Sequence, residues 1–178
     1  MADHGGGWEE HFWQSVRVEE RLKESPKKVA EHDKRLGNAD DGTGIEGWKR
    51  RTKERLAKIN DAEKALSYAP GDRATLMGAG ERLAKARERR LRQLDLLEEL
   101  HDNILRQKKL EQDLAKRLGN KDIPLESKNT LVTSTDEKIW AFYEQEDPAW
   151  EELHLLDGVI PTLAPEQEID TAIATSPH

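Results

Sequence analysis

Two identical tetrapeptides, at residues 98–101 and 151–154, combine residue types that can bind a metal ion. Both read Glu-Glu-Leu-His, so Glu98 and Glu151 each precede a histidine by three residues. Residues three apart share one face of a helix, and carboxylate and imidazole groups are common ligands of first-row transition metals. The first chemistry to consider is therefore a carboxylate-bridged metal site.

These two motifs alone do not make such a site. A ferritin-like di-iron bundle requires a further glutamate from each of two other helices. With 22 glutamates and six histidines in 178 residues, such pairs also arise by chance. The second motif is expected in a short helix between Pro148 and Gly158, because proline and glycine commonly bound helices. We expect no catalytic residue, no metal and no cofactor, and keep a ferritin-like di-iron carboxylate protein as a minor alternative.

Basic side chains are concentrated in the middle of the chain. Residues 44–118 carry a net charge of +6, whereas residues 1–43 carry −3 and residues 119–178 carry −10. Clustered lysine and arginine bind phosphate backbones, so nucleic-acid association through this basic centre is the alternative function. No aromatic residue lies between Tyr68 and Trp140 to stack on bases. The candidate nucleic-acid residues are Lys49, Arg50, Arg51, Lys53, Arg87, Arg89, Arg90 and Arg92.

Five tryptophans stand out in a chain with only two tyrosines and two phenylalanines. Trp8, Phe12 and Val16 share one face of a predicted helix, with Trp13 beside them. In one interpretation the tryptophans hold helices together within the fold. In the other, the aromatic residues between Ile139 and Leu156 form a docking motif, because aromatic side chains dominate interface energetics. The sequence leaves both interpretations open.

Long helices must position these side chains. Residues 81–118 contain no glycine or proline, and their leucines recur at helical spacing; a helix of that length is roughly 57 Å long. The leucines do not follow one strict heptad, because Gln107 and Glu111 interrupt it, and such a broad apolar face favours two neighbouring helices. We therefore expect an antiparallel hairpin made by residues 45–69 and 72–118, turning at Ala69-Pro70-Gly71-Asp72.

The two ends of the chain are predicted to form shorter elements. Ser25-Pro26 should end a first helix and begin a second, laid beside the hairpin. Residues 120–133 read as a loop, and Ser134 to Glu137 read as a capping box that opens a helix. Asp147-Pro148 should begin another short helix, and the proline-containing residues after it suggest a disordered tail.

Composition limits the class of protein. Hydrophobic residues make up 35% of the chain and charged residues 37%, which favours thin cores of paired helices. Without cysteine there is no disulfide and no thiolate metal site. The first seven residues lack a secretory pattern, and no apolar run approaches a membrane span. We expect a soluble intracellular protein of the cytoplasm or nucleus, with no membrane partner.

The sequence therefore predicts an all-α fold, an elongated antiparallel helical hairpin or bundle with coiled-coil character, short C-terminal helices and an acidic tail. The expected segments are residues 1–43, 44–119, 120–158 and 159–178. The expected function is non-catalytic: a helical interaction or assembly protein, a subunit or adaptor that binds other proteins or a second copy of itself. The expected protein-contacting residues are Leu83, Leu91, Leu94, Leu97, Leu100, Ile104, Leu105, Leu114, Leu118, Trp140, Phe142, Tyr143, Trp150 and Leu153.

Overall fold

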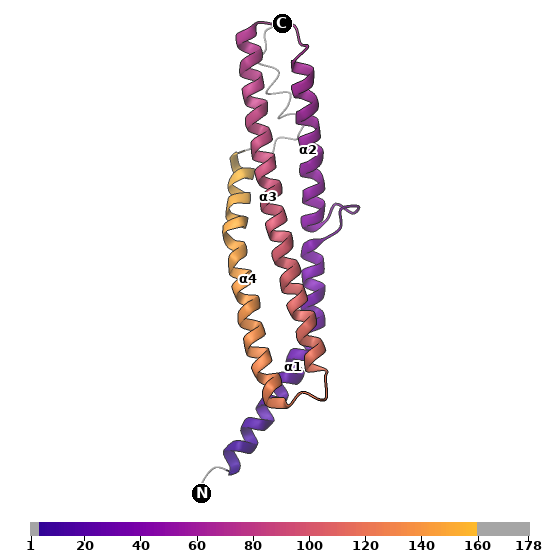
Figure 1. The fold of residues 1–178 in the computed structure, drawn as a ribbon, viewed down its shortest axis with the longest axis vertical. Helices are drawn as coiled ribbons and strands as arrows, with labels where there is room; N and C mark the ends of the chain where they lie inside the picture. Colours follow the sequence, from indigo (N-terminus) through magenta and orange to yellow (C-terminus); the bar gives the residue numbers. More distant parts are fainter. Residues whose placement is uncertain (1–3, 160–178) are drawn as a thin grey trace. The chain divides into compact units, whose positions relative to one another are not determined.

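The computed structural model describes the backbone of residues 4–159 and the side chains of residues 7–156. Within this part of the chain there are four helices and no strand, so the all-α prediction is confirmed (Figure 1). The helices are α1 (His4–Leu36), α2 (Gly44–Leu66), α3 (Arg73–Leu118) and α4 (Leu125–Val159). None of the helices in the described part is long and apolar enough to cross a membrane. The predicted tail at 159–178 lies, apart from Val159, outside the described residues.

The α2–α3 hairpin has nearly the predicted limits. Helix α2 ends three residues before the expected limit at Ala69, and α3 begins one residue after the expected Asp72. Gly71 takes the turn with a φ of 151°, which an L side chain rarely adopts. Helix α3 then continues through Gly78 and Gly80 without interruption.

The chain divides into two compact units, and each takes its helices from distant parts of the sequence. Unit 1 combines Met1–Leu36 with His101–Asp147, so α1, the end of α3 and most of α4 belong to it. Unit 2 combines Gly37–Leu100 with Pro148–His178, so α2, the start of α3 and the end of α4 belong to it. The expected segments follow chain order, whereas these units do not.

Each unit has a small apolar core. In unit 1 the core consists of Val18, Leu114, Leu118 and Val132, with Leu22, Leu125 and Leu131 packed at its margin. In unit 2 the core consists of Ile59, Ala62, Leu83 and Ala86, with Leu66 packed against them. The core of unit 1 joins α1, α3 and α4, which are far apart in sequence, whereas the core of unit 2 joins the consecutive helices α2 and α3.

The predicted helix breaks at the two interior prolines are wrong. Pro26 lies inside α1 and Pro148 lies inside α4. An interior proline costs about 3 kcal/mol because it removes a backbone hydrogen bond and crowds the preceding turn. Both proline rings are exposed, whereas Ser25 and Ala149 beside them are buried, so packing on either side holds each helix through its proline.

The predicted loop at 120–133 and capping box at 134–137 are also wrong beyond the first few residues. Helix α4 already begins at Leu125, because Leu125, Leu131 and Val132 pack into the core of unit 1. Ser134 is therefore in mid-helix, and its hydroxyl donates to the carbonyl oxygen of Leu131 at 3.3 Å instead of capping an N-terminus.

Twelve of the thirteen buried positions of α3 follow an unbroken alternation of three and four residues, and the thirteenth, Leu96, lies outside it. None of the twelve is more than 4% exposed. They are Ala79, Leu83, Ala86, Arg90, Gln93, Leu97, Leu100, Ile104, Gln107, Glu111, Leu114 and Leu118. The predicted interruption at Gln107 and Glu111 is therefore wrong: both lie in the seam, as buried polar groups. Leu91 and Leu105, which lie outside this alternation, are 47% and 41% exposed, and Leu94 is half-buried.

Candidate interaction surface

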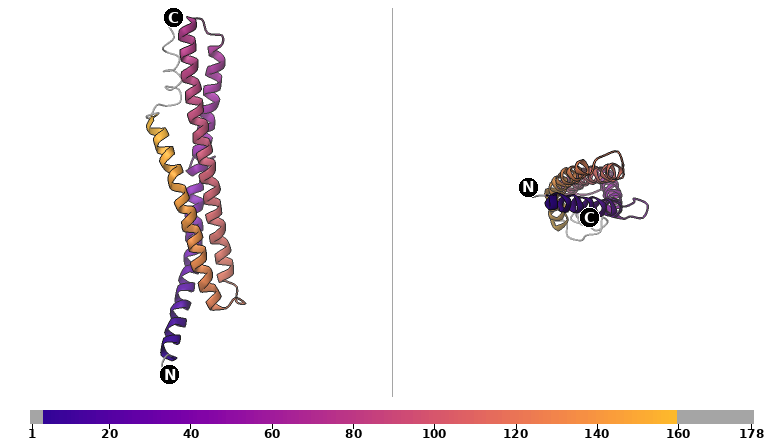
Figure 2. Two further views of the ribbon diagram at one scale, coloured as in Figure 1. Left: turned by 60° about the vertical axis from the view of Figure 1, so that its left-hand side comes forward. Right: turned by 90° about the horizontal axis from the view of Figure 1, so that it is seen from below.

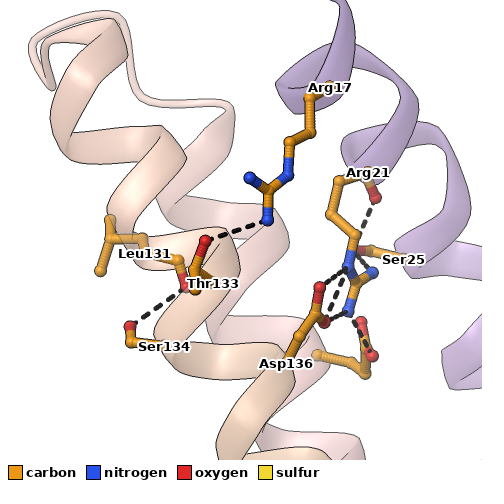
Figure 3. Close-up of polar contacts among 8 residues, drawn as sticks. Arg17, Arg21, Ser25, Leu131, Thr133, Ser134 and Asp136 are labelled. Carbon is orange, nitrogen blue, oxygen red and sulfur yellow. Dashed lines mark hydrogen bonds and ion pairs between the residues drawn. The ribbon is translucent and has the colours of Figure 1, made fainter. Parts of the chain in front are cut away.

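A buried arginine ties the three helices of unit 1 together. Arg21 of α1 donates to Glu111 of α3 at 2.6 Å and to Asp136 of α4 at 2.8 Å. Figure 3 shows the Arg21 guanidinium against Asp136, with Ser25 accepting a further hydrogen bond at 3.1 Å. Burial alone would lower the pKa of Arg21, but its hydrogen bonds to Glu111 and Asp136 outweigh that effect and raise the pKa above the ordinary value. Arg21 is thus a fixed cation.

A second polar layer lies further along α1. Arg35 forms an ion pair with Glu146 of α4, which is only 2% exposed. The other Glu146 oxygen accepts a hydrogen bond from the Gln107 amide of α3 at 2.8 Å, and Gln107 also donates to Asn103 at 2.7 Å. This layer again joins α1, α3 and α4.

His32 lies between these two layers. It is 8% exposed, and its Nδ1 atom makes no hydrogen bond to any described residue. Burial is the main cause that lowers its pKa below the ordinary 6.5, and the charge of Arg35 acts in the same direction. Glu31 on the same helix, Glu111 of α3 and Glu146 of α4 oppose the shift. The folded unit therefore favours the neutral form of His32 more than the unfolded chain does.

These polar layers fix the register of α1 on the rest of unit 1. A buried ion pair adds little net stability, but leaving one partner alone in the core costs several kcal/mol. Any slide of α1 would separate Arg21 from Glu111 and Arg35 from Glu146. The polar layers therefore determine which part of α1 packs against α3 and α4 and which part precedes the core of unit 1.

The part of α1 that precedes the core of unit 1 carries a cluster of large aromatic side chains, which we call the N-terminal aromatic segment (residues 8–13). Trp8 is 69%, Phe12 47% and Trp13 64% exposed. The rings of Trp8 and Phe12 stack with centroids 5.9 Å apart, and Trp13 meets Phe12 edge-on at 5.4 Å. Figures 1 and 2 show the first turns of α1 continuing past the loop between α3 and α4. Contiguous apolar surface of this kind is typical of interaction sites.

The sequence-based site prediction did not include this segment. The signal was present, because Trp8 and Phe12 are four residues apart on one helical face. The same spacing also fits an internal contact, and only the structure shows that these rings precede the core at Val18 and stay 47–69% exposed among the described residues.

The predicted C-terminal aromatic motif is divided between the units. Trp140 and Tyr143 belong to unit 1, are 60% and 48% exposed, and stack at 5.7 Å. Phe142 of the same unit is half-buried beside Arg106. In unit 2 the half-buried Trp150 packs on Trp48 with centroids 6.4 Å apart. Trp48 and Trp150 therefore contact each other within unit 2, whereas Trp140 and Tyr143 are exposed, and their role in docking stays a prediction.

Most of the leucine stripe expected to bind partner helices is covered within the chain itself. Six of these residues are at most 3% exposed: Leu83, Leu97, Leu100, Ile104, Leu114 and Leu118. Leu153 of α4, expected in the C-terminal docking motif, is also buried. Leu94 is half-buried. Only Leu91 and Leu105 of the expected stripe stay exposed, so the stripe serves the fold of this chain.

Six of the eight candidate nucleic-acid residues contact other groups of unit 2. Each contact is with a side chain or a backbone carbonyl of the same unit: Lys49 with Glu98 at 2.8 Å, Arg50 with Glu54 at 3.1 Å, Arg51 with the Gly42 carbonyl at 2.6 Å, Arg87 with Glu63 at 3.2 Å, Arg90 with Gln93 at 2.8 Å and Arg92 with Glu152 at 2.7 Å. Lys53 is exposed and Arg89 half-buried. The geometry thus gives the nucleic-acid alternative little support.

The Glu-x-x-His motifs do not assemble a metal site among the described residues. Glu98 pairs with Lys49, and His154 stacks on Trp150 at the surface. The short-helix argument used against the second motif is wrong, because α4 is continuous. Even so, no group of three or more ligating side chains that could hold a metal ion occurs in the part of the chain with described side chains.

The fold and this surface together define a class: an all-helical bundle protein with polar layers in its core and an exposed aromatic helix end. Beyond this class, no family model matches the chain, nor does any curated protein or solved structure in the comparisons.

Proposed function

We propose that this chain is a non-catalytic helical interaction protein, a structural subunit or adaptor of a larger protein assembly. The observation that carries the proposal is the N-terminal aromatic segment, in which three large rings are 47–69% exposed within two turns of helix. Their exposure has no role inside unit 1, whose core begins at Val18. A partner that covers them is therefore the simplest explanation for their presence.

The magnitudes support a contact of useful strength. Fully burying one large apolar side chain is worth about 1.5–3 kcal/mol. Trp8, Phe12 and Trp13 are already partly covered, so covering their exposed parts offers roughly 3–5 kcal/mol together. Binding at a Kd of about 1 μM needs about 8 kcal/mol net, after the cost of association is met. The aromatic segment would thus be the centre of an interface, with neighbouring helical surface completing it.

The alternating spacing of the buried positions also supports coiled-coil character. Such spacing keeps a seam on one side of a helix and is typical of left-handed helical packing. Polar residues at seam positions, such as Arg21 and Glu111, are known to specify register and partner choice at a cost in stability. A protein whose purpose is to present a helix end in a fixed position would be built in this way.

The test compares partners of three purified forms from the source extract: the wild type, the triple variant Trp8→Ser, Phe12→Ser, Trp13→Ser, and the control Tyr68→Ser. Tyr68 is 90% exposed and lies in unit 2, so the control also removes an exposed aromatic ring. We expect at least one stoichiometric partner to be lost by the triple variant, with affinity falling by tenfold or more, and retained by the control.

Circular dichroism must show equal helicity for all forms, because the substituted side chains make no core contact. A partner set that is identical in the wild type and the triple variant would contradict the proposal. The proposal would also be contradicted if no protein, including a second copy of the chain, bound to the wild type above background.

A further inference from the structure

The turn end of the α2–α3 hairpin in unit 2 carries an open apolar cavity of about 400 Å³. Leu66 of α2 and Leu76, Met77 and Gly80 of α3 line it, and its polar side chains are Ser67, Arg73 and Glu63, the last of which pairs with Arg87. Met77 is 58% exposed. This cavity borders the core of unit 2 at Leu66, so an apolar side chain bound there would extend an existing core.

The helices around this cavity are basic. Residues 55–89 carry eight lysine and arginine side chains against five aspartate and glutamate side chains. The surroundings therefore favour an occupant that combines apolar side chains with negative charge.

Residues 160–178 of the same chain have that composition. They contain Glu166, Glu168 and Asp170 and no lysine or arginine. Ile169, Ala172 and Ile173 follow the spacing of one helical face. This segment therefore offers both the apolar side chains and the negative charge.

The segment also has the length to reach the cavity. In unit 2, Arg92 of α3 pairs with Glu152 of α4 at 2.7 Å, so these two residues mark the same position along the two helices. The two helices run antiparallel (Figure 1), so α4 advances toward the cavity. At 1.5 Å per residue, Met77 lies about 22 Å beyond Arg92 and Val159 lies about 10 Å beyond Glu152. The remaining distance is roughly 12 Å, and 19 residues span it easily even as a helix.

We propose that residues 160–178 bind across the turn end of the α2–α3 hairpin, with their apolar side chains in the cavity lined by Leu76 and Met77. Because the segment is tethered next to its site, its effective concentration there is in the millimolar range, which a separate protein rarely matches. The inference is independent of the N-terminal aromatic segment, which belongs to unit 1.

The test uses the full chain, which contains no cysteine. The pair Met77→Cys and Ile173→Cys places one thiol in the cavity and one in the segment. The control pair, Lys53→Cys and Ile173→Cys, places the first thiol at an exposed position of α2 that does not line the cavity. Under mild oxidation we expect the first pair to form an intramolecular disulfide at least about tenfold faster than the control. The difference should disappear in concentrated urea, and Arg73→Glu should reduce it.

Two results would overturn the inference. Equal rates for the two pairs in the folded chain would show that the segment has no preference for the cavity. A product of dimer mass as the main species would show that a second copy occupies it instead. If circular dichroism shows that Met77→Cys disturbs the fold, Ser67→Cys replaces it, because Ser67 is exposed and also lines the cavity.

Discussion

Replacing Arg21 with methionine should strongly destabilise unit 1. The substitution keeps a long apolar side chain but leaves the Glu111 carboxylate, which is 0% exposed, without its cation. Removing one member of a buried ion pair costs about 3–5 kcal/mol. Asp136 adds little to this cost, because its side chain is 45% exposed and can be hydrated. We therefore expect a loss of about 3 kcal/mol.

Urea denaturation followed by circular dichroism measures this loss. With a slope of about 2 kcal/mol/M, a loss of 3 kcal/mol moves the midpoint down by roughly 1.5 M. The double variant Arg21→Met, Glu111→Leu should recover most of the stability, because it removes both charges and fills the space with apolar groups. The single variant Glu111→Gln should cost less than Arg21→Met, since Arg21 keeps Asp136.

A matched control comes from Arg92, whose ion pair with Glu152 is exposed. Arg92→Met should leave the midpoint unchanged within error, because water replaces the lost partner. The reasoning is refuted if Arg21→Met costs less than about 1 kcal/mol, or if the double variant is no more stable than Arg21→Met. Either result would mean that Glu111 can be hydrated or protonated without disturbing the helices.

Two further predictions concern pH and backbone packing. Because the folded state lowers the pKa of His32, the unfolded state binds more protons below pH 6.5. Stability should therefore fall as the pH drops from 6.5 toward the lowered pKa of His32, and above pH 6.5 it should not depend on His32. In urea denaturation between about pH 5.5 and pH 7.5, His32→Gln should flatten this pH dependence of the midpoint. An unchanged pH dependence in the variant would contradict the assignment to His32. Gly47→Ala should destabilise unit 2 by about 1–3 kcal/mol, because a Cβ there would lie 2.2 Å from the Gly42 carbonyl carbon. Gly78→Ala, whose Cβ would meet only the end of Arg82 at 3.5 Å, should stabilise α3 by up to about 1 kcal/mol, and thermal melts of the two variants test both signs.

The helix content could be read from the sequence, whereas several helix ends could not. The turn at Ala69 to Asp72 was predictable from local sequence alone. Proline ends the helical hydrogen bonds there, glycine adopts the backbone conformation of the turn, and no buried neighbour holds the helix through these residues. The same signal failed at Pro26 and Pro148. At those positions buried neighbours hold the helix, and this contribution depends on contacts with residues far away in the sequence, such as that of Arg21 with Glu111, 90 positions away, and with Asp136, 115 positions away.

The polar seam positions show the same limit. A carboxylate such as Glu111 in a leucine repeat normally marks an exposed position, since burying a lone charge is costly. It becomes compatible with burial only because Arg21 arrives from another helix. The outward-facing aromatic rings were hard to predict for the converse reason. The pattern of Trp8 and Phe12 shows that they share a face but not whether another helix reaches that face.

The buried charges and the exposed aromatic rings of α1 have one common explanation. Proteins normally bury tryptophan and expose arginine, yet here Trp8 is exposed and Arg21 is buried. A slide of α1 by one heptad into the unit would begin to cover the rings, but it would set Gln14 against Glu111 and leave that carboxylate without a cation. The cost of about 3–5 kcal/mol is comparable to what covering the aromatic side chains would return. The polar layers therefore prevent the chain from burying its own aromatic segment, which keeps that segment exposed for the partner we propose.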